Sequence, residues 1–230
     1  SNPLKDLAID LGHQPLSNNY LDEESLSREE IYYPLKAYVC NKCWLVQIPQ
    51  YTAVKEIFRK DYAYFSSTSI TWCNHAKQFV REIVKNLNLN KDSFVVEIAS
   101  NDGYLLQYFK ELNIRSLGIE PTFNTAQAAI KKGINTLNEF FSSQMAEKLI
   151  SEYLPKRKAD LVIANNVLAH VPDINDFLKG MKHILNEEGI ISIEYLLNLL
   201  PFETSTDNLM YCLARFFLKF SILEKILFLL

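Results

Sequence analysis

The sequence is poor in glycine and contains no long run of glycine, serine or proline. Only 6 of its 230 residues are glycine, which argues against long flexible linkers. An excess of basic charge is also missing: the net charge is −3, so nucleic acid is disfavoured as a partner. No basic region followed by an apolar run opens the sequence. We therefore expect no secretory signal and a cytoplasmic protein.

Cysteine is scarce as well, with 4 in the chain. Cys40 and Cys43 form a CxxC pair, which in a protein without a secretory signal indicates metal or redox chemistry more than a disulfide framework. A structural zinc site needs more ligands than these two thiols supply, and the spacing of His13 matches no zinc pattern. We therefore expect an incomplete metal site at Cys40 and Cys43, and a core position for Cys73.

From residue 93 onward, short apolar runs alternate with longer amphipathic runs. The expected strands are 93–100, 116–121, 134–138, 159–167 and 190–196, and the expected helices are 102–112, 124–133, 142–154 and 174–189. Strands that alternate with helices of this length are typical of right-handed βαβ units. The pattern predicts an α/β fold with a parallel sheet.

The rest of the chain divides by composition into further parts. We expect a small Cys-containing module over residues 1–51, a helical connector over 52–92, the α/β domain over 93–200 and an apolar helical tail over 201–230. Within the connector, both 53–67 and 68–89 have a helical pattern. Charges at 215, 219, 224 and 225 argue against a bilayer-spanning tail. An amphipathic helix packed on the domain is expected there, with a helix on a membrane surface as the alternative.

The turn after the first central strand, "IASNDGYLL", is the strongest candidate for a ligand site. Ligands of open parallel sheets bind at the carboxyl ends of the strands. A dinucleotide turn needs several glycines for the pyrophosphate, whereas this turn has only Gly103. An acid such as Glu97 or Asp102 would repel phosphate but would suit the ammonium and sulfonium of S-adenosylmethionine. Glu120, about 20 residues further along, can accept hydrogen bonds from ribose hydroxyls. The alternative is a helix-facing Glu97 and an Asp102 that only caps a helix.

The stretches "VVEIASNDGYLLQYF", "GIEP", "ANNVLAHVPDINDFLKG" and "YAYFSS" resemble those of the sugar C-methyltransferases. The resemblance runs from about Leu11 to Leu199. It implies a Rossmann-like class I methyltransferase domain that uses S-adenosylmethionine, preceded by a zinc-ribbon-like module that binds zinc in that family. The implied substrate is a small molecule, a nucleotide-linked keto-deoxysugar. The implied cofactor-binding residues are Glu97, Ser100, Asn101, Asp102, Gly103, Glu120, Pro121, Asn165 and Asn166.

The resemblance also implies candidates for catalysis. Carbon methylation needs a base that removes a proton next to the sugar ketone, and a neutral imidazole suits that task near pH 7. The resemblance gives this role to His170, while Tyr62 and Tyr64 offer phenols that could stabilise the enolate. The alternatives are a structural histidine and core tyrosines. For Trp72 and His75 we expect helix packing, and for His183 a solvated position.

Two departures from the family pattern bear on activity. The cysteine pair that precedes the "LGHQPLSNNY" segment in the family is absent, and the stretch "PFETSTDNLMYCLARFFLKF" lacks the family's YHEH-like motif. We therefore expect a chain that is truncated at both ends, with cofactor binding retained and turnover in doubt. The alternatives are a catalytically impaired cofactor-binding or interaction domain and an O- or N-methyltransferase on the same scaffold. An exposed apolar tail would favour a homo-oligomer.

Overall fold

The computed structural model describes residues 3–153, 158–194 and 226–228. These residues form two compact units, one up to Ile57 and one from Phe58 onward. Most of the apolar tail expected at 201–230 lies outside the described residues. Among the described residues, no helix is both long enough and apolar enough to cross a bilayer.

The first unit is built on a small antiparallel sheet in the order β1-β2-β3. Its strands are β1 (Asp6–Gln14), β2 (Tyr33–Val39) and β3 (Val46–Gln47), and its helices are a 3₁₀ turn at Ser25–Ser27 and α1 (Val54–Ile57). Cys40 and Cys43 lie in the turn between β2 and β3. Backbone hydrogen bonds close this turn, from the N–H of Cys40 to Leu45 and from the N–H of Trp44 to Cys40.

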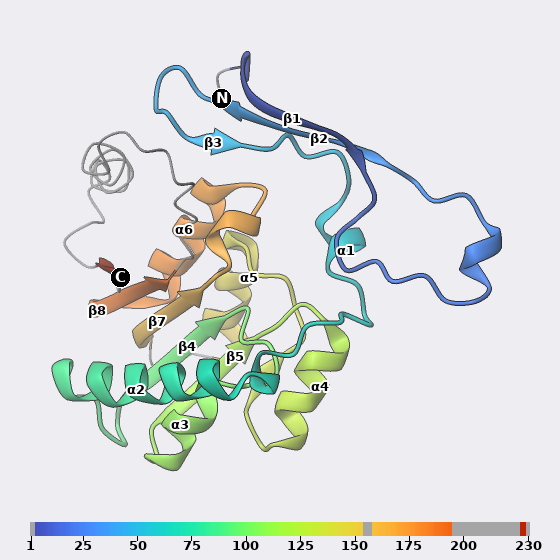
Figure 1. The fold of residues 1–230 in the computed structure, drawn as a ribbon. Helices are drawn as coiled ribbons and strands as arrows, with labels where there is room; N and C mark the ends of the chain where they lie inside the picture. Colours follow the sequence, from blue (N-terminus) through green and yellow to red (C-terminus); the bar gives the residue numbers. More distant parts are fainter. Residues whose placement is uncertain (1–2, 154–157, 195–225, 229–230) are drawn as a thin grey trace. The chain divides into compact units, whose positions relative to one another are not determined.

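The second unit contains a parallel sheet in the order β6-β5-β4-β7-β8-β9 (Figure 1). Its strands are β4 (Phe94–Ile98), β5 (Arg115–Ile119), β6 (Thr136–Leu137), β7 (Ala159–Asn165), β8 (Leu185–Glu194) and β9 (Ile226–Phe228). The chain runs from β4 through β5 to β6 and then returns to the other side of β4 with β7. Strand order therefore reverses at β4, and the crevice for a ligand is expected at the carboxyl ends of β4 and β7.

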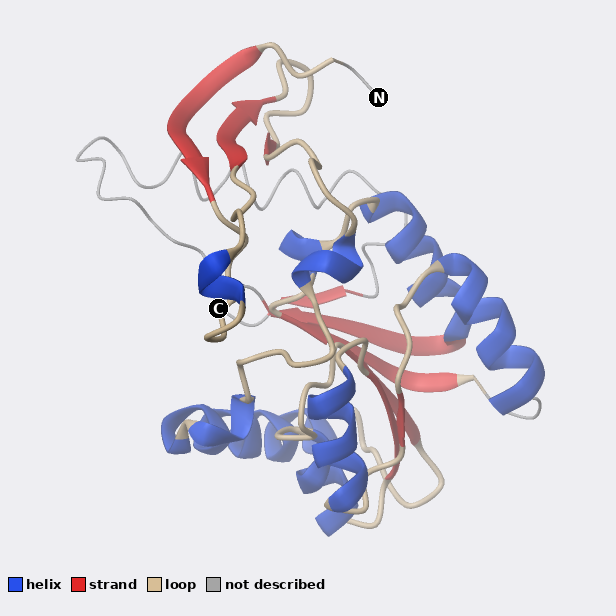
Figure 2. Cartoon of the chain, turned by 90° about the vertical axis from the view of Figure 1, so that its right-hand side faces the viewer, coloured by secondary structure: helices blue, strands red, loops and turns tan. Residues whose placement is uncertain are grey.

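Helices flank this sheet on both sides (Figure 2). They are α2 (Ile70–Asn86), α3 (Leu106–Glu111), α4 (Phe123–Lys131), α5 (Ser143–Lys148) and α6 (Ile174–Ile184), with 3₁₀ turns at Ser66–Thr68 and Leu168–His170 and a π-helical turn at Leu149–Tyr153. The start of α2 is capped by Ser69, whose hydroxyl accepts a hydrogen bond from the N–H of Trp72. The predicted Rossmann-like α/β architecture is confirmed for this unit.

The alternation of side chains along β4 explains why its acid, Glu97, faces apolar neighbours. Side chains alternate along a strand, so Glu97 points to the same face as Val95. On that face, Val95 packs in a core cluster with apolar residues of α2 and α3, among them Phe79 and Phe109. The sequence of β4 therefore places one carboxylate inside a hydrophobic layer, close to the strand's carboxyl end.

The structure corrects three of the predicted helices. Most of 53–67 is not helical: only Val54–Ile57 forms an α-helix there. Backbone groups of Tyr62, Tyr64, Ser66 and Ser67 bond instead to the side chains of Asn101, Asp102 and Asn124, and the Lys60 carbonyl accepts from the N–H of Asn124. The helix predicted over 174–189 ends at Ile184, where β8 begins and pairs with β7. In the predicted helical tail, 226–228 is instead a strand that pairs with the exposed edge of β8.

Candidate functional site

The turn after β4 has the backbone of a glycine-rich turn although it contains one glycine. Ala99, Asn101 and Gly103 have φ angles of 58°, 49° and 75°. This left-handed region is open to glycine, tolerated by asparagine and strained for alanine. At Gly103 the packing is also tight, since a Cβ there would lie 3.0 Å from Ile134. Every second residue from 99 to 103 thus has a left-handed backbone. The number of glycines alone did not predict this conformation.

Hydrogen bonds join this turn to the carboxyl end of β5. The N–H of Asn101 donates to Oε2 of Glu120 over 2.8 Å. The other carboxylate oxygen of Glu120 accepts from the N–H of Thr122 over 2.9 Å and from the Thr122 hydroxyl. Asn138 supports the next residue by donating to the carbonyl of Pro121 over 2.9 Å. The structure therefore brings the turn and the strand-end acid together, and Glu120 is held in place by the backbone.

Glu97 is buried without a hydrogen-bond partner. Its exposed fraction is 1%, and neither carboxylate oxygen is bonded to any described residue. Burial, followed by the charges of Glu120 and Asp102, raises the pKa of Glu97 well above its usual range. The buried Ser100 hydroxyl and Oδ1 of Asn165 also lack a partner among the described residues. Unsatisfied buried acceptors are costly. Four of these atoms lie in β4 and at the ends of β4 and β7, and two more, from Asn186 and Ser192, lie in β8.

An aromatic and acidic cluster extends this site toward β8. The ring of Trp72 stacks on Tyr104, 6.0 Å between centroids, and on His75, 5.0 Å between centroids. His75 in turn contacts Glu194, with 2.9 Å between Nε2 and Oε1. Burial and the Glu97 charge raise the pKa of the Tyr104 phenol well above its usual range. Sequence reasoning left Glu194, Tyr104 and the His75 contact out of the site.

The structure gives two of the predicted cofactor residues other contacts. The carboxylate of Asp102 accepts hydrogen bonds from the hydroxyl of Ser67 and, over 3.0 Å, from Nζ of Lys132. It therefore fixes neighbouring segments of the unit. Asn166 is exposed and adopts φ 52°, and its N–H donates to the carbonyl of Glu194 over 2.7 Å. This bond continues the β7–β8 pairing beyond the strands.

His170 and Tyr62 are brought together around Phe58. The Phe58 ring lies 5.6 Å from the ring of Tyr62 and contacts His170 edge-on at 6.1 Å, measured between centroids. Partial burial lowers the pKa of His170 from its usual value, which favours the neutral imidazole. Burial, followed by the charges of Glu120 and Tyr64, raises the pKa of Tyr62. Tyr64 itself is exposed.

The CxxC turn of the first unit does not complete a metal site. In the part of the chain that the structure describes, no group of three or more His, Cys, Asp or Glu side chains could hold a metal ion. Cys40 is buried and Cys43 is half-buried in the β2–β3 turn. The described residues thus offer two thiols, and they do not fit a structural zinc site.

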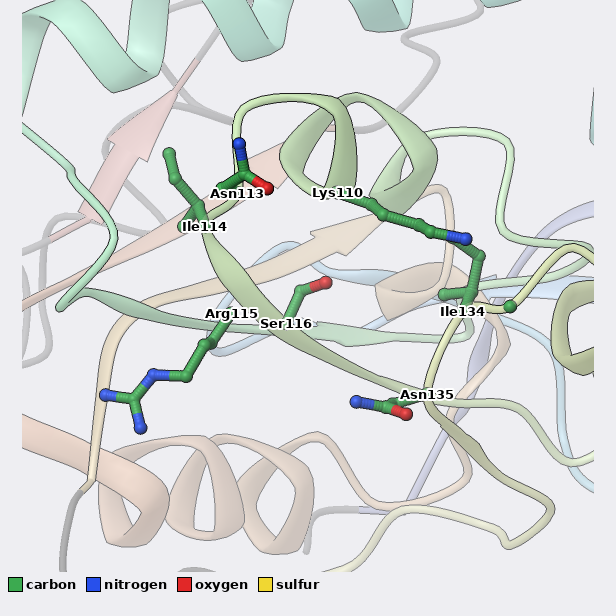
Figure 3. Close-up of a pocket in the computed structure, with 8 residues that line it drawn as sticks. Lys110, Asn113, Ile114, Arg115, Ser116, Ile134 and Asn135 are labelled. Atoms are coloured by element: carbon green, nitrogen blue, oxygen red, sulfur yellow. The ribbon is translucent and has the colours of Figure 1, made fainter.

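A pocket of about 230 Å³ lies away from all these groups (Figure 3). It is at the amino end of β5, between the ends of α3 and α4, and is lined by Lys110, Asn113, Ile114, Arg115, Ser116, Gly133, Ile134 and Asn135. Its cations already bond to backbone carbonyls, Lys110 to Lys132 over 2.8 Å and Arg115 to Asp92 over 3.2 Å. Ligand sites of such sheets form at the opposite edge, where Glu97 and Glu120 lie.

Comparison with known proteins decides the family. Residues 72–220 match the family model described as "Methyltransferase domain", which covers well over half of the chain. The chain belongs to this methyltransferase family. Residues 1–58 match a second family model, described as "Putative zinc binding domain".

Two curated proteins and one solved structure illustrate the similarity. C-methyltransferase NovU of Streptomyces niveus is 29% identical over 194 residues, which cover 84% of this chain and 45% of NovU. The tRNA U34 carboxymethyltransferase of Nautilia profundicola is 30% identical over 128 residues, which cover 53% of this chain and 40% of that protein. The chain thus spans less than half the length of these relatives. The plantazolicin methyltransferase BpumL, solved in complex with a pentazolic desmethylPZN analog and SAH, has a TM-score of 0.43 and 16% identity, covering 62% of this chain and 55% of BpumL.

Proposed function

We propose that this methyltransferase binds S-adenosylmethionine at the carboxyl ends of β4, β5 and β7. The observation that carries the proposal is a group of three buried acceptors without donors among the described residues, namely both oxygens of Glu97 and Oδ1 of Asn165. A ligand that presents N–H donors and positive charge would satisfy them, as the ammonium and sulfonium of this cofactor do. Anionic phosphates would instead meet the carboxylates of Glu97 and Glu120.

Further residues of the turn have separate roles in this proposal. The fixed carboxylate of Glu120 retains lone pairs that can accept hydrogen bonds from the ribose hydroxyls. The Ser100 hydroxyl is buried and bonds to none of the described residues, and Gly103 allows α4 to approach closely. Asp102 and Pro121 act indirectly, by positioning the chain segments to which they bond. Asn166 extends the side of the cofactor site formed by Asn165.

The proposed reaction is methylation of carbon in a nucleotide-linked keto-deoxysugar. The resemblance to sugar C-methyltransferases and the similarity to NovU support it. The bound cofactor supplies an electrophilic methyl group. The neutral imidazole of His170 accepts the proton from the carbon next to the ketone, and the electron pair of that C–H bond forms the enolate. The raised pKa keeps Tyr62 protonated, so its hydroxyl can donate a hydrogen bond to the enolate oxygen.

A methyl-transfer assay with a panel of keto-sugar nucleotides tests this function. The full chain is incubated with methyl-labelled S-adenosylmethionine, and NMR of the product locates the label. We expect a new carbon–methyl bond and, without the methyl donor, deuterium exchange at the same carbon that His170→Ala abolishes. A methyl group on oxygen or nitrogen would replace the proposal with another methyltransferase activity. Cofactor binding without transfer to any member of the panel would favour a catalytically impaired domain.

A further inference from the structure

Residues 60–67, here called the tyrosine segment, bond to two asparagines as well as to Asp102, which accepts hydrogen bonds from Ser67. Asn101 follows β4, and its Oδ1 accepts a hydrogen bond from the N–H of Ser66 over 2.8 Å while its Nδ2 donates to the carbonyl of Tyr64 over 3.1 Å. Asn124 lies at the start of α4, and its Nδ2 donates to the carbonyl of Tyr62 over 2.7 Å. The N–H of Asn124 also donates to the carbonyl of Lys60 over 3.1 Å. The turn after β4 and the start of α4 thus each contribute attachment points for the segment.

The backbone of Asn101 and its side chain do different things. The backbone adopts φ 49°, and its N–H bonds to Glu120, which glycine could do equally well. The side chain is buried, and both its oxygen and its nitrogen bond to the tyrosine segment. A glycine at this position would preserve the turn but would leave Tyr64 and Ser66 unattached.

We propose that Asn101 is a positioning residue that fixes Tyr62 and Tyr64 of the tyrosine segment relative to the cofactor turn. The inference rests on the proposed function, since it assigns the turn to the cofactor and the tyrosines to the acceptor. In this inference the Asn101 side chain does not contact the cofactor. It connects the cofactor turn to the tyrosine segment. Asparagine suits this position because it tolerates the left-handed backbone and its side-chain amide can bond to the tyrosine segment.

Asn101→Gly tests this inference, with Asn113→Gly as the matched control. Asn113 also has a left-handed backbone, at φ 55°, but it lies beside the distant pocket at the amino end of β5 (Figure 3). Amide hydrogen exchange is measured for each variant in the full chain, without ligand and at a saturating concentration of S-adenosylhomocysteine. In Asn101→Gly we expect exchange at Ser66 to rise about tenfold in both states, because its N–H loses its acceptor, and exchange at Ser67 to rise less, because its N–H bonds to Asp102. Exchange within β4 should stay at the parental rate, and Asn113→Gly should leave the tyrosine segment unchanged.

Two further variants show which hydrogen bond protects which part of the tyrosine segment from exchange. Asn124→Ala removes the side-chain bond to Tyr62 but keeps the backbone bond to Lys60, so it should loosen the segment around Tyr62 and leave Ser66 protected. Asn101→Asp retains the acceptor for Ser66 but loses the donor to Tyr64, so exchange should rise by less than in Asn101→Gly. If the parent turns over an acceptor in the sugar panel, Asn101→Gly should lower kcat about tenfold. Asn113→Gly should leave kcat unchanged.

The outcomes separate this inference from the proposed function. Parental exchange of the tyrosine segment in Asn101→Gly, or equal loosening in Asn113→Gly, overturns the positioning role even if the cofactor binds. A parent that does not bind S-adenosylhomocysteine overturns the cofactor assignment, whereas the exchange measured without ligand still reports whether Asn101 holds the segment.

Discussion

Glu97 lies in β4 and Glu120 directly follows the neighbouring parallel strand β5, and the charge of Glu120 adds to burial in raising the pKa of Glu97. Such an arrangement is unfavourable for the ligand-free protein, because Glu97 has neither solvent nor a hydrogen-bond donor. It becomes favourable when a cation enters the site. Stability and binding should therefore respond in opposite directions to changes at Glu97, as expected where strained or unsatisfied groups serve function.

Glu97→Gln is predicted to stabilise the ligand-free protein while weakening cofactor binding. Above pH 4.5, Glu97 keeps its proton in the folded protein but loses it in the unfolded chain. The free energy of unfolding therefore falls as the pH rises from 4.5 through the raised pKa of Glu97. Removing it should raise the melting temperature at pH 8 by about 2–4 °C. Affinity for S-adenosylmethionine should fall about tenfold or more. Calorimetry measures both effects, and Glu111→Gln on the exposed surface of α3 is the control. A destabilised variant with parental affinity would contradict the role given to Glu97.

Glu120→Ala is predicted to lower affinity for S-adenosylmethionine at least tenfold, because it removes the proposed ribose acceptor. The change also breaks the bonds that Glu120 accepts from Asn101 and Thr122. Glu120→Gln distinguishes these effects, since it retains one oxygen and the size of the side chain, and its affinity should lie between the two. Equal binding by the parent and Glu120→Ala would remove the ribose assignment. The exposed Glu139→Ala serves as the comparison.

Ala99→Gly is predicted to stabilise the protein by about 1 kcal/mol, because φ at this position is 58° and strains a residue with a Cβ. Ala128→Gly, within α4, is the matched control and should destabilise by about 1 kcal/mol. Denaturant titration gives both values. Destabilisation by Ala99→Gly would indicate that packing of the Ala99 methyl group outweighs the backbone strain.

Phe58→Ala is predicted to raise the pKa of His170 toward its ordinary value of 6.5, because the Phe58 ring covers the imidazole. NMR titration of the histidine side chains measures this, with His170→Ala to assign the resonance. In the parent, His170 should titrate below 6.5, which reduces stability as pH falls from 6.5 through the lowered pKa. An unchanged His170 pKa in Phe58→Ala would show that Phe58 does not shield it.

The sheet was predictable from sequence because its signals are local. Apolar strands such as "FVVEI" alternate with amphipathic helices, and the strand-end position of Glu120 follows from "GIE". The same reasoning could have found Glu194, which ends β8 in "SIE". Its partner His75 is 119 residues away, and no local pattern predicts that contact.

The remaining features depend on tertiary structure. Helical periodicity predicted a helix over 53–67, but hydrogen bonds to Asn101, Asp102 and Asn124 hold much of this segment in an irregular conformation. Propensity also disfavours Ala99 in a left-handed conformation, so the sequence alone indicated a turn with a single glycine. The irregular conformation within 53–67 and the left-handed backbone of Ala99 both depend on contacts between segments that are distant in the sequence.

Calorimetric titration of the full chain with S-adenosylmethionine, and separately with a nicotinamide dinucleotide, tests the central claim most directly. We expect saturable binding of one S-adenosylmethionine per chain and no binding of the dinucleotide, because the buried acceptors of the β4 and β7 ends favour a cation without phosphate. Saturable binding of the dinucleotide, or no heat of binding with S-adenosylmethionine, would contradict it.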